Sequence, residues 1–197
     1  MATETLPLFP LGTVLFPGGL LDLRVFEPRY LDMVRDCGRG DHGFGVCLIL
    51  QGEEVGAPAL PAAVGCEARI EDFSSSPDGL LQLKVRGGRR FHVEHSRVRD
   101  NGLVVGEVRW LPAPPPRTLR PEYDLLALLL RRMVERAGPA NRMQATEADF
   151  RDADWVGWRL AEWLPLDGDE RQLLLQDDAA DQRLQRLVEW IPRFQAA

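Results

Sequence analysis

Lysine is almost absent from this chain of 197 residues, since Lys84 is the only lysine among 24 basic residues. A phosphate-binding loop of the Walker type needs a lysine that neutralises phosphate, followed by a Ser or Thr that holds magnesium. Lys84 is followed by Val85 and lies in a predicted strand. The sequence therefore excludes ATP hydrolysis at such a site, and it leaves one residue for any reaction that depends on a lysine.

Cysteine and histidine are also scarce. The chain has an odd number of cysteines without C-x-x-C spacing, at Cys37, Cys47 and Cys66. This pattern predicts reduced thiols in a cytoplasmic protein, and neither a disulfide framework nor a zinc site. His92 and His95 are three apart in a predicted strand, so their side chains face opposite ways, and His42 has no Cys or carboxylate at ligand spacing. We expect no metal and no cofactor.

Long apolar runs and a basic leader are missing as well. The segment 125–130 is among the longest apolar runs and is far too short to span a bilayer, and the first ten residues lack a signal-peptide pattern. The net charge is −6, with 12 basic and 15 acidic residues up to Leu111 and the same numbers after it. We expect a soluble cytoplasmic protein without a membrane partner and with little affinity for nucleic acid.

The first part of the chain has the pattern of a small β-domain. Short strands are predicted at 13–16 and 20–26, and a helix is predicted from Pro28 to Cys37, ended by Gly38 and Gly40. Further strands are predicted at 42–50, 64–73, 80–86, 91–98 and 103–111, with Gly87-Gly88 as one of the turns between them. Regular strands with such turns indicate a compact sandwich or a partly closed barrel.

The second part of the chain is predicted to be helical. A proline-rich linker, 112–118, separates a β-rich subdomain, 1–111, from a helical subdomain, 119–197. The predicted helices are 119–136, with Leu125, Leu126, Leu129, Met133 and Val134 on its apolar face, and 154–164, 169–175 and 179–190. Strands followed by helices predict an α+β protein whose two subdomains meet at a cleft.

Several short motifs, in this order and spacing, resemble the N-terminal substrate-binding domain of Lon proteases. They are Leu6-Pro7-Leu8-Phe9-Pro10, Leu15-Phe16-Pro17-Gly18, Phe26-Glu27-Pro28-Arg29-Tyr30, Phe44-Gly45-Val46, Gly65-Cys66-Glu67-Ala68-Arg69-Ile70, Arg86-Gly87-Gly88-Arg89-Arg90-Phe91, and Leu164-Pro165-Leu166 followed by Arg171-Gln172-Leu173-Leu174-Leu175. The resemblance covers residues 6–190 and implies a PUA-like β-barrel or sandwich followed by a helical bundle.

This resemblance also implies a function. It implies binding of unfolded or degron-bearing polypeptides, with a protease or a chaperone as partner, and no catalytic residues within the domain. In full-length Lon an ATPase module and a Ser-Lys peptidase module follow, whereas this chain ends after the last predicted helix. We therefore expect a stand-alone, non-catalytic recognition module that acts as an adaptor or accessory in protein quality control.

Four aromatic residues are the candidates for peptide binding: Tyr30, Trp110, Trp155 and Trp158. In the helix 154–164, Trp155 and Trp158 lie roughly opposite the face formed by Val156, Leu160, Trp163 and Leu164. Two interpretations stay open for the tryptophans. They pack against the β-rich subdomain, or they line an exposed groove that accepts peptide.

Two other functions remain as alternatives. A PUA-like fold can bind RNA, and the basic residues Lys84, Arg86, Arg89, Arg90, Arg97 and Arg99 are close together in the sequence. A hydrolase with a Ser-Lys dyad would have to use Lys84. Strand alternation places Lys84 on the face opposite Leu83 and Val85, in solvent, whereas a lysine must be desolvated to act as a base. We expect no enzymatic activity.

Overall fold

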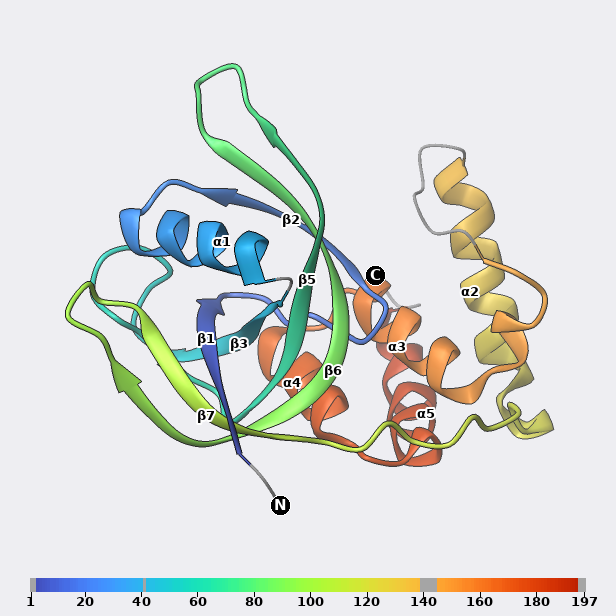
Figure 1. Ribbon diagram of the computed structural model, residues 1–197. Coiled ribbons are helices and arrows are strands. Elements are labelled where there is room, and N and C mark those ends of the chain that lie inside the picture. The colour runs from blue at the N-terminus through green and yellow to red at the C-terminus, as the bar shows by residue number, and fades with distance from the viewer. Residues whose placement is uncertain (1–2, 41, 139–144, 195–197) are drawn as a thin grey trace. The chain divides into compact units, whose positions relative to one another are not determined.

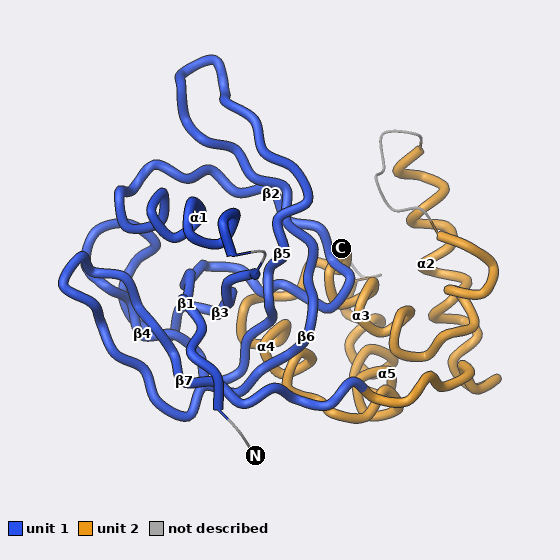
Figure 2. Tube along the Cα trace, in the orientation of Figure 1, with its two compact units in different colours: residues 1–113 blue, residues 114–197 orange. Residues whose placement is uncertain are grey.

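The computed structural model describes residues 3–40, 42–138 and 145–194. The chain divides into two compact units, unit 1 from Met1 to Ala113 and unit 2 from Pro114 to Ala197 (Figure 2). The first unit is mostly antiparallel sheet and the second is helical, so the α+β class is confirmed (Figure 1).

Unit 1 contains seven strands and one α-helix in its described part. They are β1 (Glu4–Leu11), β2 (Leu20–Val25), α1 (Pro28–Gly40), β3 (Phe44–Gln51), β4 (Leu60–Pro61), β5 (Val64–Ser75), β6 (Leu81–Val98) and β7 (Val104–Trp110). Five of these strands pair in the ring β1-β7-β6-β5-β3, and a parallel pairing of β1 with β3 closes it. The sheet is therefore a closed barrel, to which β2 is added on β6 and β4 on β3.

Strand β1 was not predicted, because Pro7 and Pro10 interrupt its sequence. Its first half, from Glu4 to Pro7, pairs with β7, and its second half, from Leu8 to Leu11, pairs with β3. Each half therefore has an unpaired side, where the absence of a proline N–H is harmless. The strand predicted at 13–16 was wrong, because this segment is a loop that buries Val14, Leu15 and Phe16.

The turn predicted at Gly87-Gly88 was also wrong, because β6 runs through it as one strand of 18 residues. Gly87 exchanges backbone hydrogen bonds of 2.8 Å with Gly18 and Gly19. A Cβ at Gly87 would overlap the Phe16 carbonyl oxygen, and one at Gly88 would press on the Glu67 carboxylate. Gly87 permits the close approach of a second backbone, Gly88 leaves room for the Glu67 side chain, and neither glycine reverses the chain.

Helix α1 packs on the barrel through one apolar face. Tyr30, Met33 and Cys37 are buried in the main apolar cluster of the unit, together with side chains of the surrounding strands. Gly38 does not end the helix, which continues to Gly40. A second, smaller apolar cluster of unit 1 surrounds Phe91.

Unit 2 contains four α-helices in its described part. They are α2 (Asp124–Ala137), α3 (Ala153–Trp163), α4 (Gly168–Gln176) and α5 (Ala180–Trp190), accompanied by the 3-10 turns η1 (Pro121–Tyr123), η3 (Asp149–Arg151) and η4 (Ile191–Phe194). Helix α3 contacts α2, α4 and α5 and is buried over most of its length. No helix in the described part of the chain is long and apolar enough to cross a membrane.

The apolar face of α2 differs from the one predicted. The helix starts after a 3-10 turn, and its buried positions are Leu126 and Leu130, one turn apart. Leu125 was predicted on that face but is 77% exposed. The neighbouring residue occupies the buried row, and a shift of one residue rotates a side chain by about 100° around the helix.

Candidate functional site

An apolar groove in unit 1 lies between α1 and the hairpin formed by β5 and β6. The hairpin extends beyond the barrel next to α1 (Figure 1). The groove has a volume of about 670 Å³. Its apolar lining consists of Leu31 and Val34 from α1, Ile70 and Phe73 from β5, and Leu81 and Leu83 from β6. A concave, mostly apolar surface of this size is typical of a binding site.

A β-bulge brings two side chains of β5 into the groove together. Residues three apart in a regular strand face opposite sides of the sheet. The pairing of β5 with β6 shifts between Ile70 and Asp72, so one extra residue is inserted there. Ile70 and Phe73 therefore both lie among the residues that line the groove.

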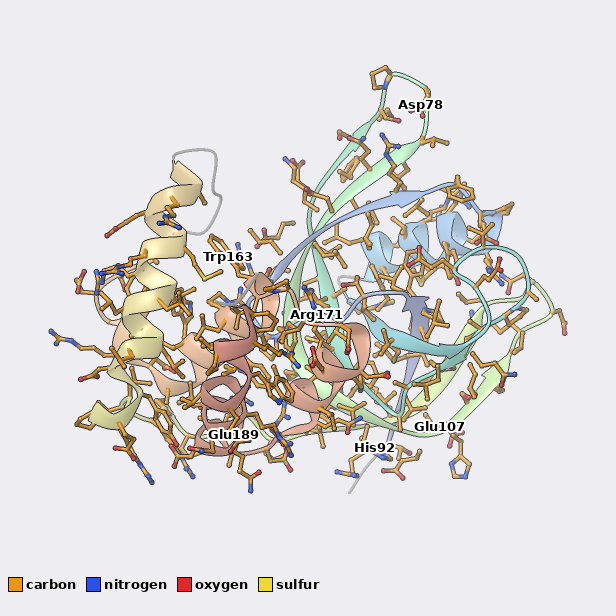
Figure 3. All side chains as sticks on the ribbon, turned by 180° about the vertical axis from the view of Figure 1, so that it is seen from behind. Asp78, His92, Glu107, Trp163, Arg171 and Glu189 are labelled. Carbon is orange, nitrogen blue, oxygen red and sulfur yellow. The ribbon has the colours of Figure 1, made fainter. Side chains whose placement is uncertain are left out.

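Phe73 is the most exposed apolar side chain of the groove, with 72% of its surface accessible. Phe73 is two residues before the end of β5, and Asp78 marks the tip of the hairpin (Figure 3). The Ser76 hydroxyl donates to the Asp78 carboxylate, and this hydrogen bond lowers the pKa of Asp78. Gly79 has a φ of 82° and completes the turn. The exposed phenyl ring is thus carried by an ordered hairpin.

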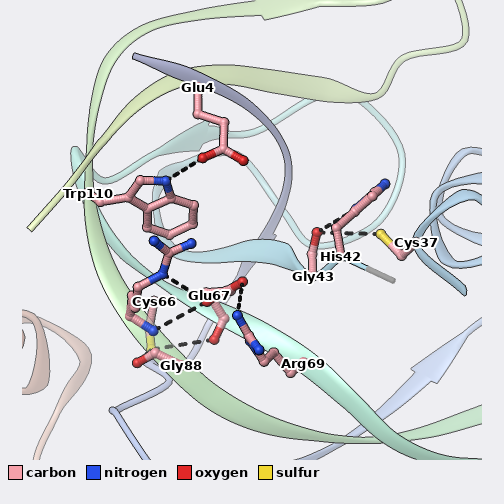
Figure 4. A network of polar contacts seen from close by, with 10 residues as sticks. Glu4, Cys37, His42, Gly43, Cys66, Glu67, Arg69, Gly88 and Trp110 are labelled. Atoms are coloured by element: carbon pink, nitrogen blue, oxygen red, sulfur yellow. Dashed lines mark hydrogen bonds and ion pairs between the residues drawn. The ribbon is translucent and has the colours of Figure 1, made fainter. Parts of the chain in front are cut away.

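The polar groups around the groove already have partners. Arg35 Nη1 lies 2.8 Å from Asp32, and Arg69 Nη2 lies 3.4 Å from the buried Glu67 carboxylate (Figure 4). The Cys37 thiol donates to the Gly43 carbonyl oxygen at 3.6 Å, and burial raises its pKa to about 11. The groove therefore presents apolar surface and offers no thiolate nucleophile near neutral pH.

A second, smaller cavity of about 370 Å³ lies beside β2 and the start of α1. Tyr30 and Phe9 contribute to its wall, with their ring centroids 4.0 Å apart in a stacked arrangement. Tyr30 is 5% exposed, and burial raises its pKa. The predicted candidate Tyr30 is thus mainly a core residue of unit 1.

Trp110 lies in a different cluster of unit 1 from Tyr30, so these two candidates do not share one groove. The indole Nε1 of Trp110 donates to Glu4 Oε2 at 2.6 Å, and the Arg89 guanidinium lies 3.8 Å from the ring centroid (Figure 4). These contacts fasten β7 to β1 and β6.

Trp155 and Trp158 both belong to α3, and contacts within unit 2 surround them. The backbone N–H of Trp155 donates to the helix-capping carboxylate of Asp152 at 2.9 Å, and its ring meets Phe150 edge-on at 5.2 Å. Trp158 is 5% exposed, and the Arg183 guanidinium lies 3.2 Å from its ring centroid. Trp158 is therefore part of the core of unit 2.

The basic residues that follow one another in β6 are mostly paired with acids. Lys84 Nζ lies 3.3 Å from Asp72, and Arg86 forms an ion pair with Glu71. Arg89 Nε lies 3.6 Å from Glu67, and Arg90 is buried. Lys84 is on the outer face, as strand alternation predicts, while Leu83 and Val85 are buried. Acidic partners therefore compensate Lys84, Arg86 and Arg89, whereas Arg97 and Arg99, the last two members of the predicted cluster, are exposed.

The described residues also show what the groove lacks. Within 3–40, 42–138 and 145–194, no group of three or more His, Cys, Asp or Glu side chains is placed to hold a metal ion.

The groove residues were not among the predicted candidates. A weak signal was present in the sequence, since Phe73 stands between two acids and three serines, surroundings that do not suit a buried residue.

Comparison with known proteins places these features in a family. The chain is 52% identical to the Lon N-terminal domain protein from Xanthomonas campestris, whose crystal structure superposes with a TM-score of 0.81 over 95% of this chain and 98% of that one. The N-terminal domain of the Mycobacterium avium complex Lon protease is 16% identical and has a TM-score of 0.67, over 95% of this chain and 97% of that one, which shows the same fold.

Curated relatives match over shorter regions. Cereblon from Danio rerio is 27% identical over 56% of this chain and 26% of its own length. A Lon protease from Cytophaga hutchinsonii is 28% identical over 62% of this chain and 15% of its own. The chain thus spans about a quarter or less of these relatives. A family model described as the ATP-dependent protease La (LON) substrate-binding domain matches residues 5–193. Because that match covers nearly the whole chain, the chain belongs to the Lon substrate-binding domain family.

Proposed function

We propose that this protein is a non-catalytic module that binds unfolded or degron-bearing polypeptides in the groove between α1 and the β5–β6 hairpin. The observation that carries the proposal is the exposed Phe73 ring beside an apolar groove of about 670 Å³. Exposed apolar patches in soluble proteins are typical of interaction sites. A flexible polypeptide loses conformational entropy when it binds, so we expect a Kd of about micromolar.

The absence of catalysis is part of this proposal. The only lysine, Lys84, is on the outer face of β6 in an ion pair with Asp72, whereas a lysine that acts as a base is desolvated. Burial raises the pKa of the Cys47 thiol to about 12 and that of Cys37 to about 11, so both thiols are neutral near pH 7.

The biological setting is proposed from the family. Two of the curated relatives are Lon proteases, in which the matching region is a small part of a longer protein. We assign this chain the role of an adaptor or accessory that presents polypeptides to a cytoplasmic protease or chaperone. The closed five-strand ring with one helix packed on it also supports a PUA-like topology for unit 1.

Binding of a permanently unfolded protein tests the proposal. Reduced, carbamidomethylated α-lactalbumin is titrated into the protein, and the complex is followed by isothermal calorimetry. We expect Phe73→Ser to weaken binding about tenfold or more, because an exposed aromatic side chain is the type of residue that dominates interface energy. Its exposure of 72% means that the substitution leaves the fold intact.

The matched control is Leu125→Ser on α2. Leu125 is 77% exposed and is not one of the groove-lining residues, so its substitution removes a similar exposed apolar side chain without changing the lining of the groove. We expect this variant to bind as the unaltered protein does. Equal weakening by both substitutions, or no binding by the unaltered protein, would contradict the proposal.

A further inference from the structure

Strand β5 is longer than the strand paired with one of its edges. On one side, β6 pairs with β5 from Val64 to Ser75. On the other side, β3 pairs with β5 only as far as Ala68, and no other strand in the described part of the chain pairs with residues 69–75. Residues 71–75 are all exposed. Such an edge presents main-chain N–H and C=O groups that can form a ladder with another chain.

We propose that this edge, residues 69–75 of β5, binds an extended polypeptide segment as an additional strand. The inference rests on the function proposed above, since it names the form in which the polypeptide binds. Strand addition provides affinity through main-chain hydrogen bonds, which are independent of sequence, and selects side chains at alternate positions. A module that receives many unfolded proteins benefits, because the main-chain part of the affinity does not depend on the sequence of the bound segment.

One main-chain donor of this segment, the Phe73 N–H, has a side-chain hydrogen-bond partner that a bound strand could replace. The Phe73 N–H donates to the carboxylate of Asp72, its own neighbour in the strand, at 2.9 Å. An incoming carbonyl oxygen can take the place of this carboxylate. Asp72 then keeps its ion pair with Lys84 Nζ, 3.3 Å away, so its charge stays compensated.

The groove defines the side chains that an added strand would carry. Alternate residues of a strand point to the same face, so every second side chain of the ligand would lie over the apolar surface of Leu31, Val34 and Phe73. The free edge of seven residues is about 23 Å long, enough for three or four such side chains. The ligand is therefore an extended segment with apolar residues at alternate positions.

The charges near the edge argue that the groove-facing side chains are neutral. Glu71 is paired with Arg86, Asp72 with Lys84, Arg35 with Asp32, and Arg69 with Glu67. None of these pairs leaves a strong excess of one sign beside the groove. An acidic, basic or phosphorylated ligand would therefore gain little electrostatic attraction there, whereas a neutral apolar strand does not depend on such attraction.

The test uses a pair of backbone-methylated peptides. The probe is a fluorescein-labelled peptide of about nine residues in which valine and phenylalanine alternate with threonine, flanked by glutamine. One version carries N-methyl groups on the odd amides and the other on the even amides. Only one set of amides can face β5, so we expect one version to bind about tenfold or more weakly and the other to bind within about threefold of the unmethylated peptide. Fluorescence anisotropy measures each affinity.

Hydrogen exchange of the full-length protein supplies the second readout. We expect binding of the unmethylated peptide to slow amide exchange in residues 69–75, and Phe73→Ser to abolish that protection. Equal affinity of all three peptides, with binding still lost in Phe73→Ser, would overturn strand addition and leave the proposed function standing. If α-lactalbumin and every peptide fail to bind, the proposed function itself fails. If the free protein forms dimers that Phe73→Ser disrupts, and no peptide binds, a second copy of the chain occupies the edge and the inference is wrong.

Discussion

Two glycines of unit 1 have opposite requirements for space. Gly87 lies in β6, where a Cβ would overlap the carbonyl oxygen of Phe16. Gly38 lies inside α1, where a Cβ would meet nothing within 4 Å, and the helix would gain from a better helix former. The same substitution at these two positions therefore separates the effect of close approach from that of backbone freedom.

We expect Gly87→Ala to destabilise the protein by about 1–3 kcal/mol, because the backbone of β6 must shift. We expect Gly38→Ala to stabilise it by about 0.5–1 kcal/mol, because glycine costs that much more than alanine within a helix. Urea denaturation followed by circular dichroism measures both changes. A loss of stability in both variants would show that Gly38 has a steric role that its surroundings do not indicate.

The buried thiol of Cys47 makes stability depend on pH. Its pKa is raised by burial from 9.0 to about 12, so the folded protein holds the proton more tightly than the unfolded chain does. Its contribution is complete below pH 9 and is lost as pH rises from about 9 to about 12. We expect the free energy of unfolding to fall by about 1.4 kcal/mol between pH 8 and pH 10 from this group. In Cys47→Ala, which is less stable at every pH, this part of the decline should be missing from urea titrations at the two pH values.

At the scale of elements, α5 is attached to α3 through a buried arginine. Arg183 is fully buried, forms an ion pair with Asp154, and donates from Nη1 to the Asp177 carbonyl oxygen at 2.9 Å. Gly157 leaves room for it, since a Cβ there would lie 2.8 Å from Arg183 Nε. This arrangement explains why α3 carries a glycine in its middle.

We expect Arg183→Met to destabilise unit 2 by about 3–5 kcal/mol, since it leaves the Asp154 carboxylate without its main buried partner. Adding Asp154→Asn should restore part of that loss. The control is Arg186→Met, whose side chain is 43% exposed and pairs with Asp177, and which should cost less than about 1 kcal/mol. Thermal unfolding followed by circular dichroism distinguishes the three variants, and equal costs for Arg183 and Arg186 would contradict the role given to burial.

The elements also show where prediction from sequence succeeded and where it could not. Helix α1, strand β5 and helices α3 to α5 follow apolar periodicity and clear end signals, and the structure places them within a few residues of the predicted bounds. Strand β1 was hidden by Pro7 and Pro10, because local rules do not reveal that a strand changes partner between them. Gly87-Gly88 has the appearance of a turn, and only the neighbouring Gly18-Gly19 backbone explains it.

The groove could not be predicted for a similar reason. Phe73 joins Ile70 on one face because of a bulge, and no residue in this segment signals that bulge by itself. Trp155 and Trp158 were predicted as candidates because they lie roughly opposite the apolar face of their helix. In the structure Trp158 is covered by Arg183, a contact between residues 25 positions apart that periodicity does not report.

At the scale of the whole molecule, charge distinguishes polypeptide binding from RNA binding. The net charge is −6, and the basic residues of β6 are mostly compensated by acids. We expect the affinity for the neutral peptide probe to change less than about twofold between 50 and 200 mM salt. An affinity for RNA that depends on several phosphate contacts would instead fall by about a thousandfold or more over the same range. Anisotropy titrations at both salt concentrations, with a labelled single-stranded RNA in parallel, measure this. RNA binding with a steep salt dependence would favour the alternative function.

The pairing of the first strand of the barrel with the last imposes an order on folding during synthesis. Strand β1 leaves the ribosome well before its partner β7, which ends at Trp110, about a hundred residues later. Contacts between such distant segments form late in folding. Until β7 emerges, the half of β1 that pairs with it lacks its partner strand, and the apolar side chain of Leu6, buried in the finished protein, remains uncovered on the nascent chain. A protein proposed to receive unfolded chains thus exposes, during its own synthesis, an apolar segment that later becomes part of its barrel.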